Sequence, residues 1–167
     1  LILELDKLNK RVAIKWVKPQ LLHLTLHFLG YLDKNQEEQI IKTLSEAVAN
    51  YRVAKVETGA IGAFPNSISP RIIYLECREV EGDIIGSLQK EIGRALERSG
   101  YKIDRRLWQA HLSLGRVKGG GKVNLSVKDL PSAKFNIASV ELMESRLTQT
   151  GPEYSIIKSF NFTSTSS

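Results

Sequence analysis

The sequence predicts a single α+β domain built from two similar halves. A strand-like His-Leu-hydroxyl-Leu motif begins at His23 and recurs at His111, in a chain with only three histidines. Helix-period and strand-period segments follow each other in a similar order around both motifs. A chain of 167 residues is long enough to bury a substantial core. We therefore expect one bilobal, pseudo-twofold α+β domain over residues 1–167, with the two polar motif faces meeting across a groove.

The first motif is predicted to lie on a strand over residues 22–30. Apolar and polar residues alternate there, and side chains two apart on a strand share a face. The alternation directs one set toward the core: Leu22, Leu24 and Leu26. The opposite face carries the other set: His23, Thr25 and His27. An exposed strand face with this composition is unusual and indicates a site.

The other elements follow from spacing and end signals. An amphipathic helix is expected over residues 1–9, and a capping box at Asp33 and Gln36 begins a helix over residues 34–50. A second long helix over residues 82–99 ends at Gly100. Further strands are expected at residues 52–61, 71–77, 133–145 and 154–162, loops at 62–67 and 118–122, and a frayed tail at 163–167.

The paired motifs suit acid–base chemistry at phosphorus. Imidazole titrates near neutral pH, so one ring can accept a proton while the other donates one. Thr25 and Ser113 each follow a histidine by two residues, and Arg116 lies just beyond. Hydroxyl and guanidinium donors can stabilise the negative charge of a five-coordinate phosphorus. A single His-x-Thr on a strand is more often an ordinary surface feature, but the repeat with identical leucines favours a site.

Composition limits the alternatives. The formal charge of +6 favours an anionic partner. No apolar run approaches the length of a membrane span, and we expect no membrane association. The lone Cys77 lies in an apolar strand, which predicts a buried, inert thiol and fits a reducing, cytoplasmic compartment. The chain begins at Leu1 in a segment that already has helical spacing, so something is expected to be missing upstream.

A zinc site and a phosphate loop are the rival interpretations. His23 and His27 are four residues apart, about 13 Å along a strand, too far to share one ion. The sequence Lys118-Gly119-Gly120-Gly121-Lys122 lacks the full phosphate-loop spacing and has no helix after it. We therefore expect no metal and no cofactor, and a mobile basic turn at residues 118–122.

The sequence resembles the two-histidine (2H) phosphoesterases, in particular the RNA 2′,3′-cyclic phosphodiesterase group, also called the 2′-5′ RNA ligase family. The similarity extends beyond the two motifs to the approach to the first one, a middle segment and a closing hairpin. The segments that carry it are Trp16–Pro19, His23–Leu26, Phe28–Gly30, Gly62–Pro65 with Pro70–Ile72, His111–Val117, and Glu144–Leu147 with Gly151, Pro152 and Tyr154. Members of the family usually begin with an apolar strand before the first helix, and this strand is expected to be missing from the sequence.

The resemblance implies a bilobal fold, with antiparallel sheets lining a central positive cleft and helices outside. It implies a metal-independent enzyme that opens 2′,3′-cyclic phosphate ends of RNA to 2′-phosphomonoesters. By position, His23 with Thr25 and His111 with Ser113 are the catalytic pairs. Arg116 matches the phosphate-contacting arginine and Phe28 the base-stacking aromatic, although strict alternation places both on the core face and requires a bulge.

The sequence is compatible with more than one assignment of roles to its histidines and with more than one function. We favour His111 as the base and His23 as the acid, but the sequence does not assign them. His27 stands where the family commonly has lysine, and is expected to be a substrate-side neighbour. The alternatives are a 2′-5′ RNA ligase that runs the same site in reverse, and a non-catalytic RNA-binding module. The expected partner is RNA with cyclic ends, tRNA among the candidates, bound by a monomer.

Overall fold

The computed structural model describes residues 1–130, 132–148 and 151–163 and divides them between two compact units. Unit 1 consists of Leu1–Thr25, Val56–Arg78 and Gln109–Phe135. Unit 2 consists of Leu26–Lys55, Glu79–Trp108 and Asn136–Ser167. The chain thus enters each unit three times.

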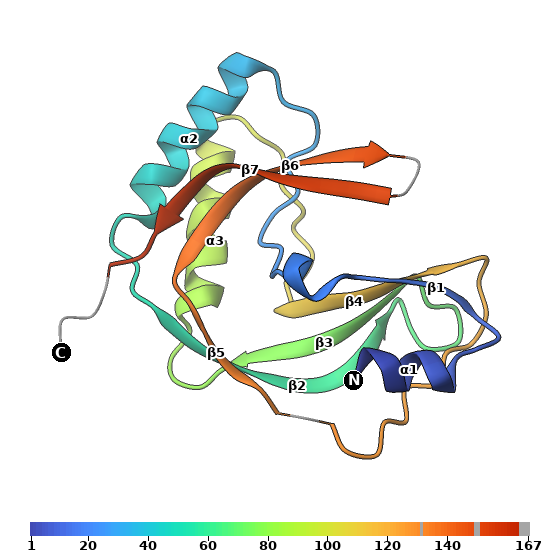
Figure 1. Cartoon of the computed structure of the whole chain (residues 1–167). Helices are drawn as coiled ribbons and strands as arrows, with labels where there is room; N and C mark the ends of the chain where they lie inside the picture. Colours follow the sequence, from blue (N-terminus) through green and yellow to red (C-terminus); the bar gives the residue numbers. More distant parts are fainter. Residues whose placement is uncertain (131, 149–150, 164–167) are drawn as a thin grey trace. The chain divides into compact units, whose positions relative to one another are not determined.

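A five-stranded sheet with strand order β1-β4-β3-β2-β5 organises unit 1 (Figure 1). Its strands are β1 (Ala13–Trp16), β2 (Ala54–Phe64), β3 (Ile72–Glu79), β4 (His111–Lys118) and β5 (Lys134–Ile137). Two short helices accompany them, α1 (Ile2–Leu8) and η1 (Pro19–Leu21). Strand β4 pairs antiparallel with β3 from His111 onward and with β1 from Gly115 onward, so the second motif precedes the part of β4 that pairs with β1.

One face of this sheet forms the core of unit 1. Alternate residues of β3 are buried, including Ile73 and Leu75, and they pack with Leu114 of β4 and Leu5 of α1. Burying these apolar side chains stabilises the unit by roughly 1.5–3 kcal/mol each. The opposite face is left for the polar members of the same strands.

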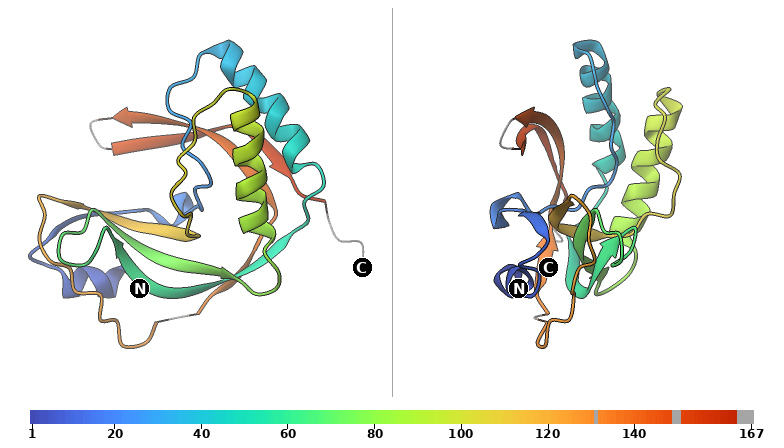
Figure 2. Two further views of the ribbon diagram at one scale, coloured as in Figure 1. Left: turned by 180° about the vertical axis from the view of Figure 1, so that it is seen from behind. Right: turned by 90° about the vertical axis from the view of Figure 1, so that its right-hand side faces the viewer.

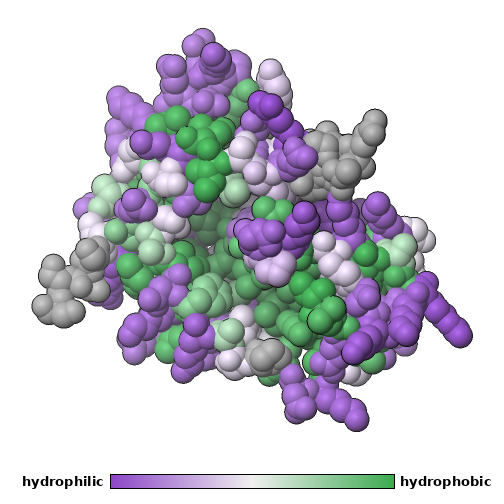
Figure 3. Space-filling model, in the orientation of Figure 1, coloured by the Kyte–Doolittle hydropathy of each residue, from purple (hydrophilic) through white to green (hydrophobic). Residues whose placement is uncertain are grey.

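Unit 2 consists mainly of two helices and a hairpin. These are α2 (Lys34–Val48), α3 (Ile84–Arg98), β6 (Ser139–Thr148) and β7 (Gly151–Asn161). The helices lie side by side (Figure 2), with Ile40 and Leu44 of α2 and Leu88 of α3 buried. Hydrophilic side chains cover most of the outer end of α2, at the top of Figure 3. The helices are therefore amphipathic, as their spacing predicts.

The predicted start of α2 and the glycine after α3 are confirmed, whereas α2 ends at Val48 and α3 begins at Ile84. Asp33 and Gln36 form a reciprocal capping box at the start of α2. Gly100 follows α3 with φ of +88°, the left-handed conformation that favours glycine. At the start of α3, the Glu79 carboxylate accepts hydrogen bonds from the amides of Ile84 and Ile85. The sequence did not indicate this cap, because Glu79 lies five residues upstream of the helix.

The predicted strand over residues 22–30 is wrong for most of its length. Only Leu24 pairs with another strand, and residues 26–33 have no regular structure. The chain passes from unit 1 to unit 2 after Thr25, which ends the pairing despite the continued alternation.

Three other boundaries differ from the predictions. Ala13–Trp16 forms an unpredicted strand, β2 continues through the expected loop as far as Phe64, and the strand expected over 133–145 divides into β5 and β6. Thr163, placed in the frayed tail, donates its backbone N–H to the Tyr51 carbonyl at 2.8 Å. The rest of that tail, residues 164–167, lies outside the described residues.

Candidate active site

The two His-x-hydroxyl motifs lie next to each other in unit 1. Leu24 forms an isolated antiparallel bridge with Leu112. In this register His23 is opposite Ser113 and Thr25 is opposite His111. Directly opposed residues share a face, with Cβ atoms roughly 4.5–5.5 Å apart, and diagonal neighbours such as the two histidines roughly 7–8 Å apart. Leu22 and Leu112 pack against the core on the other face.

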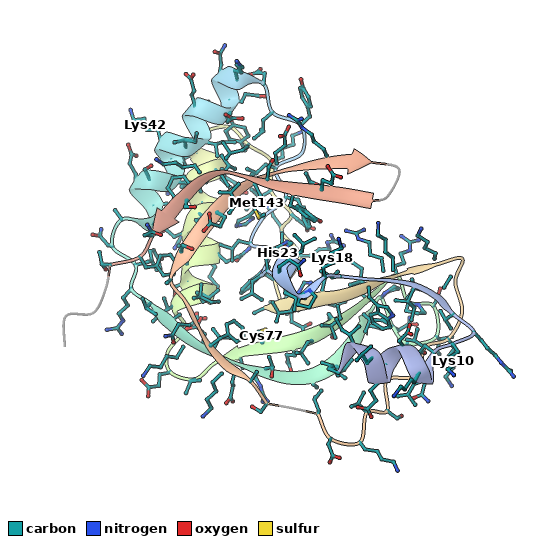
Figure 4. The ribbon with its side chains drawn as sticks, in the orientation of Figure 1. Lys10, Lys18, His23, Lys42, Cys77 and Met143 are labelled. Carbon is teal, nitrogen blue, oxygen red and sulfur yellow. The ribbon has the colours of Figure 1, made fainter. Side chains whose placement is uncertain are left out.

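Both motif histidines are oriented by the same kind of hydrogen bond. Nδ1 of His23 lies 2.8 Å from the Leu21 carbonyl oxygen, and Nδ1 of His111 lies 2.7 Å from the Gln109 carbonyl oxygen. A carbonyl oxygen can only accept, so Nδ1 of each ring carries the hydrogen. Nε2 is therefore the nitrogen of each ring that can exchange a proton with a substrate. Figure 4 shows His23 close to Lys18, beside η1.

A bulge brings Arg116 onto the same face as the histidines. Pairing between β3 and β4 shifts by one residue between Ile73 and Tyr74, which leaves Leu114 as an extra residue in β4. Arg116 is consequently opposite Ile72, on the face that also carries Tyr74 and Ser113. The irregularity required for the phosphate-contacting role of Arg116 is present.

The same register adds a cation that sequence reasoning missed. Lys15 of β1 is directly opposite Arg116. Its neighbours Ile14 and Trp16 pack against the core, so the Lys15 side chain leaves from the opposite face. The available signal was the alternation of Ala13-Ile14-Lys15-Trp16, which predicts a short strand with the lysine on the polar side.

Two aromatic rings from neighbouring strands contact His111. The Phe64 and Tyr74 rings are stacked with centroids 4.2 Å apart. Both rings meet the imidazole edge-on, Phe64 at 5.1 Å and Tyr74 at 5.5 Å between centroids. Neither ring was predicted from the sequence to be part of the site, although Phe64 belongs to the middle segment of the family resemblance.

The two remaining predicted site residues belong to unit 2. The imidazole Nε2 of His27 lies 2.8 Å from the Gln89 carbonyl oxygen of α3, and its ring packs near Gly93. Phe28 is 81% exposed. The contacts of His27 are those of a residue that anchors its segment to a helix, and the substrate-side roles of both residues stay predictions.

Cys77 is buried, as the apolar run predicts. Burial raises the pKa of its thiol to about 11, so the nucleophilic thiolate is scarce at neutral pH. Among the described residues, no cluster of three or more His, Cys, Asp or Glu side chains could hold a metal ion. No helix of the described part of the chain is long and apolar enough to cross a membrane.

Two imidazoles, two hydroxyls and a guanidinium on one sheet face define a phosphoesterase of the two-histidine class. The family model described as LigT like Phosphoesterase matches residues 2–74. The chain is 31% identical over 163 residues to an RNA 2′,3′-cyclic phosphodiesterase of Archaeoglobus fulgidus, covering 93% of this chain and 88% of the relative. The chain belongs to this LigT-like, two-histidine phosphoesterase family.

Other relatives and solved structures are also similar to this chain over most of its length. An RNA 2′,3′-cyclic phosphodiesterase of Methanocaldococcus jannaschii is 32% identical over 155 residues, covering 89% of this chain and 85% of the relative. A crystal structure of a Thermus thermophilus protein superposes with a TM-score of 0.77 at 20% identity, covering 96% of this chain and 89% of that one. The E. coli LigT complex with 3′-AMP gives 0.76 at 19% identity, covering 97% and 89%. The predicted fold class is confirmed.

Proposed function

We propose that this chain is a metal-independent RNA 2′,3′-cyclic phosphodiesterase. The observation that carries the proposal is the Leu24–Leu112 bridge, because its register sets both His-x-hydroxyl pairs side by side on one face. The RNA 2′,3′-cyclic phosphodiesterases of Archaeoglobus fulgidus and Methanocaldococcus jannaschii are 31% and 32% identical to this chain over most of its length. The substrate is a 2′,3′-cyclic phosphate at an RNA end, tRNA among the candidates, acted on by a cytoplasmic monomer without a cofactor.

The reaction divides between the two Nε2 atoms. Nε2 of His111 removes a proton from water, whose oxygen bonds to phosphorus. The bond from phosphorus to O3′ breaks, and Nε2 of protonated His23 gives its proton to O3′. The product is a 2′-phosphomonoester with a free 3′-hydroxyl. One ring must start neutral and the other protonated, which predicts a bell-shaped dependence of rate on pH.

The charge that develops on the non-bridging oxygens needs donors beside the histidines. Thr25 and Ser113 offer hydroxyls, and Arg116 offers a planar guanidinium that keeps its charge at all relevant pH. Lys15 opposite Arg116 makes a pair of like charges, an arrangement that destabilises a sheet unless an anion neutralises it. We assign Lys15 to the same phosphate-binding face.

The deciding experiment is an assay with 2′,3′-cyclic mononucleotides and cyclic-ended RNA in excess chelator. Chromatography against authentic 2′- and 3′-phosphates identifies which hydroxyl keeps the phosphate. We expect the 2′-phosphate. Failure to turn over either substrate, or formation of the 3′-phosphate, would contradict the proposal.

The reverse reaction is the second candidate, since both directions share one transition state and the same two imidazoles. Supplying a 5′-hydroxyl RNA with the cyclic-ended strand tests it by the appearance of a 2′-5′ junction. Salt-dependent RNA binding without any product would instead indicate the non-catalytic binding module.

A further inference from the structure

We propose that Tyr74 and Phe64 are positioning residues that hold the His111 imidazole in line for proton transfer. We also propose that the lack of a side chain at Gly62 leaves the space that the Tyr74 ring occupies. This inference rests on the proposed function for its kinetic consequences, but its structural part can be tested without any substrate. It concerns residues of β2 and β3, neither of which carries a histidine motif.

The Tyr74 ring has a defined seat in the sheet. Tyr74 is opposite Ser113, two positions along β3 from Glu76, which is opposite His111. A Cβ atom added at Gly62 would lie 2.3 Å from both Cζ and Oη of Tyr74 and 2.8 Å from Cε1. The ring therefore lies directly over the Gly62 backbone, where only glycine leaves enough space.

Phe64 also lies on β2 and contacts the Tyr74 ring. It follows Gly62 by two residues on β2, so both share the face opposite the core neighbours Ile61 and Ala63. Its ring stacks on Tyr74 at an interplanar angle of 19°. The stacked rings of Phe64 and Tyr74 thus form a wall beside the site.

The wall restricts His111 in the direction that its hydrogen bond leaves free. A single bond from Nδ1 to the Gln109 carbonyl permits the imidazole to tilt about that bond. The two edge-to-face contacts, at interplanar angles of 76° with Phe64 and 66° with Tyr74, limit this tilt. Because misplacing a reacting group by about 1 Å can cost roughly 100-fold in rate, the wall fixes the position of Nε2.

The test compares three substitutions with a matched control. Tyr74→Leu removes the Tyr74 ring, and Gly62→Ala displaces it. Each substitution should lower kcat by about ten- to a hundredfold, with KM changed less than about threefold. Tyr74→Phe keeps the ring and should stay within about twofold of the unsubstituted protein. Tyr51→Leu removes a ring from the tilted Tyr51–Phe162 pair of unit 2, with centroids 6.4 Å apart, and should leave kcat unchanged.

A second readout is independent of activity. ¹³C relaxation of the His111 ring should show an ordered imidazole in the unsubstituted protein and in Tyr74→Phe, and a more mobile one in Tyr74→Leu and Gly62→Ala. Folded Tyr74→Leu protein with an ordered His111 ring, or equal losses of kcat in Tyr74→Phe and Tyr74→Leu, would overturn the proposal. An unsubstituted protein without turnover but with an ordered His111 ring would refute only the proposed function.

Discussion

The three histidines of this chain are bonded in two different ways, and the difference distinguishes His27 from the two motif histidines. His23 and His111 of unit 1 each use Nδ1 to reach a carbonyl two residues earlier in the chain. His27 of unit 2 uses Nε2 to reach the Gln89 carbonyl of a helix. The first arrangement assigns proton exchange to Nε2, the outer nitrogen, whereas the second occupies that nitrogen. Sequence spacing alone placed His23 and His27 on the same face of one strand.

Replacing a motif histidine should have the largest effect. We expect His111→Ala and His23→Ala each to lower kcat by roughly 10²–10⁴-fold, because each removes a proton-transfer group. The double variant should be little worse than either single one, since the groups act as a unit. Steady-state kinetics on a cyclic-ended oligonucleotide measures this, and undiminished turnover by His111→Ala would sink the two-histidine mechanism.

Removing a motif hydroxyl should rank second. Ser113→Ala takes away a donor to the developing oxyanion and should lower kcat by about 100-fold. Ser113→Thr retains the hydroxyl and serves as the control. If Ser113→Ala were as active as Ser113→Thr, the hydroxyl of this motif would have no role in charge stabilisation.

The Lys15 and Arg116 pair should affect binding more than chemistry. Lys15→Gln removes one cation and should raise KM about three- to tenfold, with a shallower dependence of KM on salt. Arg116→Lys keeps the charge but loses the guanidinium fork, and should cost more than Lys15→Arg. Lys42→Gln on α2 of unit 2 is the matched control. A KM that Lys15→Gln leaves unchanged would remove Lys15 from the phosphate-binding face.

His27 should affect stability and leave the rate intact. His27→Leu deletes the bond to the Gln89 carbonyl and should lower the free energy of unfolding by about 1 kcal/mol. Urea denaturation measures this, with His27→Gln as the variant that can still donate a hydrogen bond. A large fall in kcat with unchanged stability would restore the substrate-side role expected from the sequence.

The smallest effect should come from Cys77. Burial raises the pKa of its thiol from 9.0 to about 11, so alkylation by iodoacetamide at about pH 8 should be far slower in the folded chain than in urea. The unfolded thiol ionises first as pH rises, so stability should fall between about pH 9 and pH 11. Mass spectrometry after timed alkylation checks the first point, and rapid native labelling would contradict it.

The sequence predicts that the two motifs come together, but across a groove, whereas the structure pairs them side by side within unit 1. Alternation around Leu24 and Leu112 correctly directs the histidines and hydroxyls away from the core, because burial of alternate residues sets the period of a strand. It could not show that the pairing stops after Thr25, since His27 continues the same alternation. It also gave no sign of Tyr74, whose role depends on a cross-strand glycine 12 residues earlier.

The extra residue Leu114 reverses the alternation of side-chain direction along β4. Before it, odd-numbered positions face the site, and after it, even-numbered positions do, so Ser113 and Arg116 point the same way although three residues separate them. Deleting one residue there would rotate the guanidinium into the hydrocarbon interior while the histidine stayed in place. The three-residue spacing between Ser113 and Arg116 therefore keeps both side chains on one face of β4.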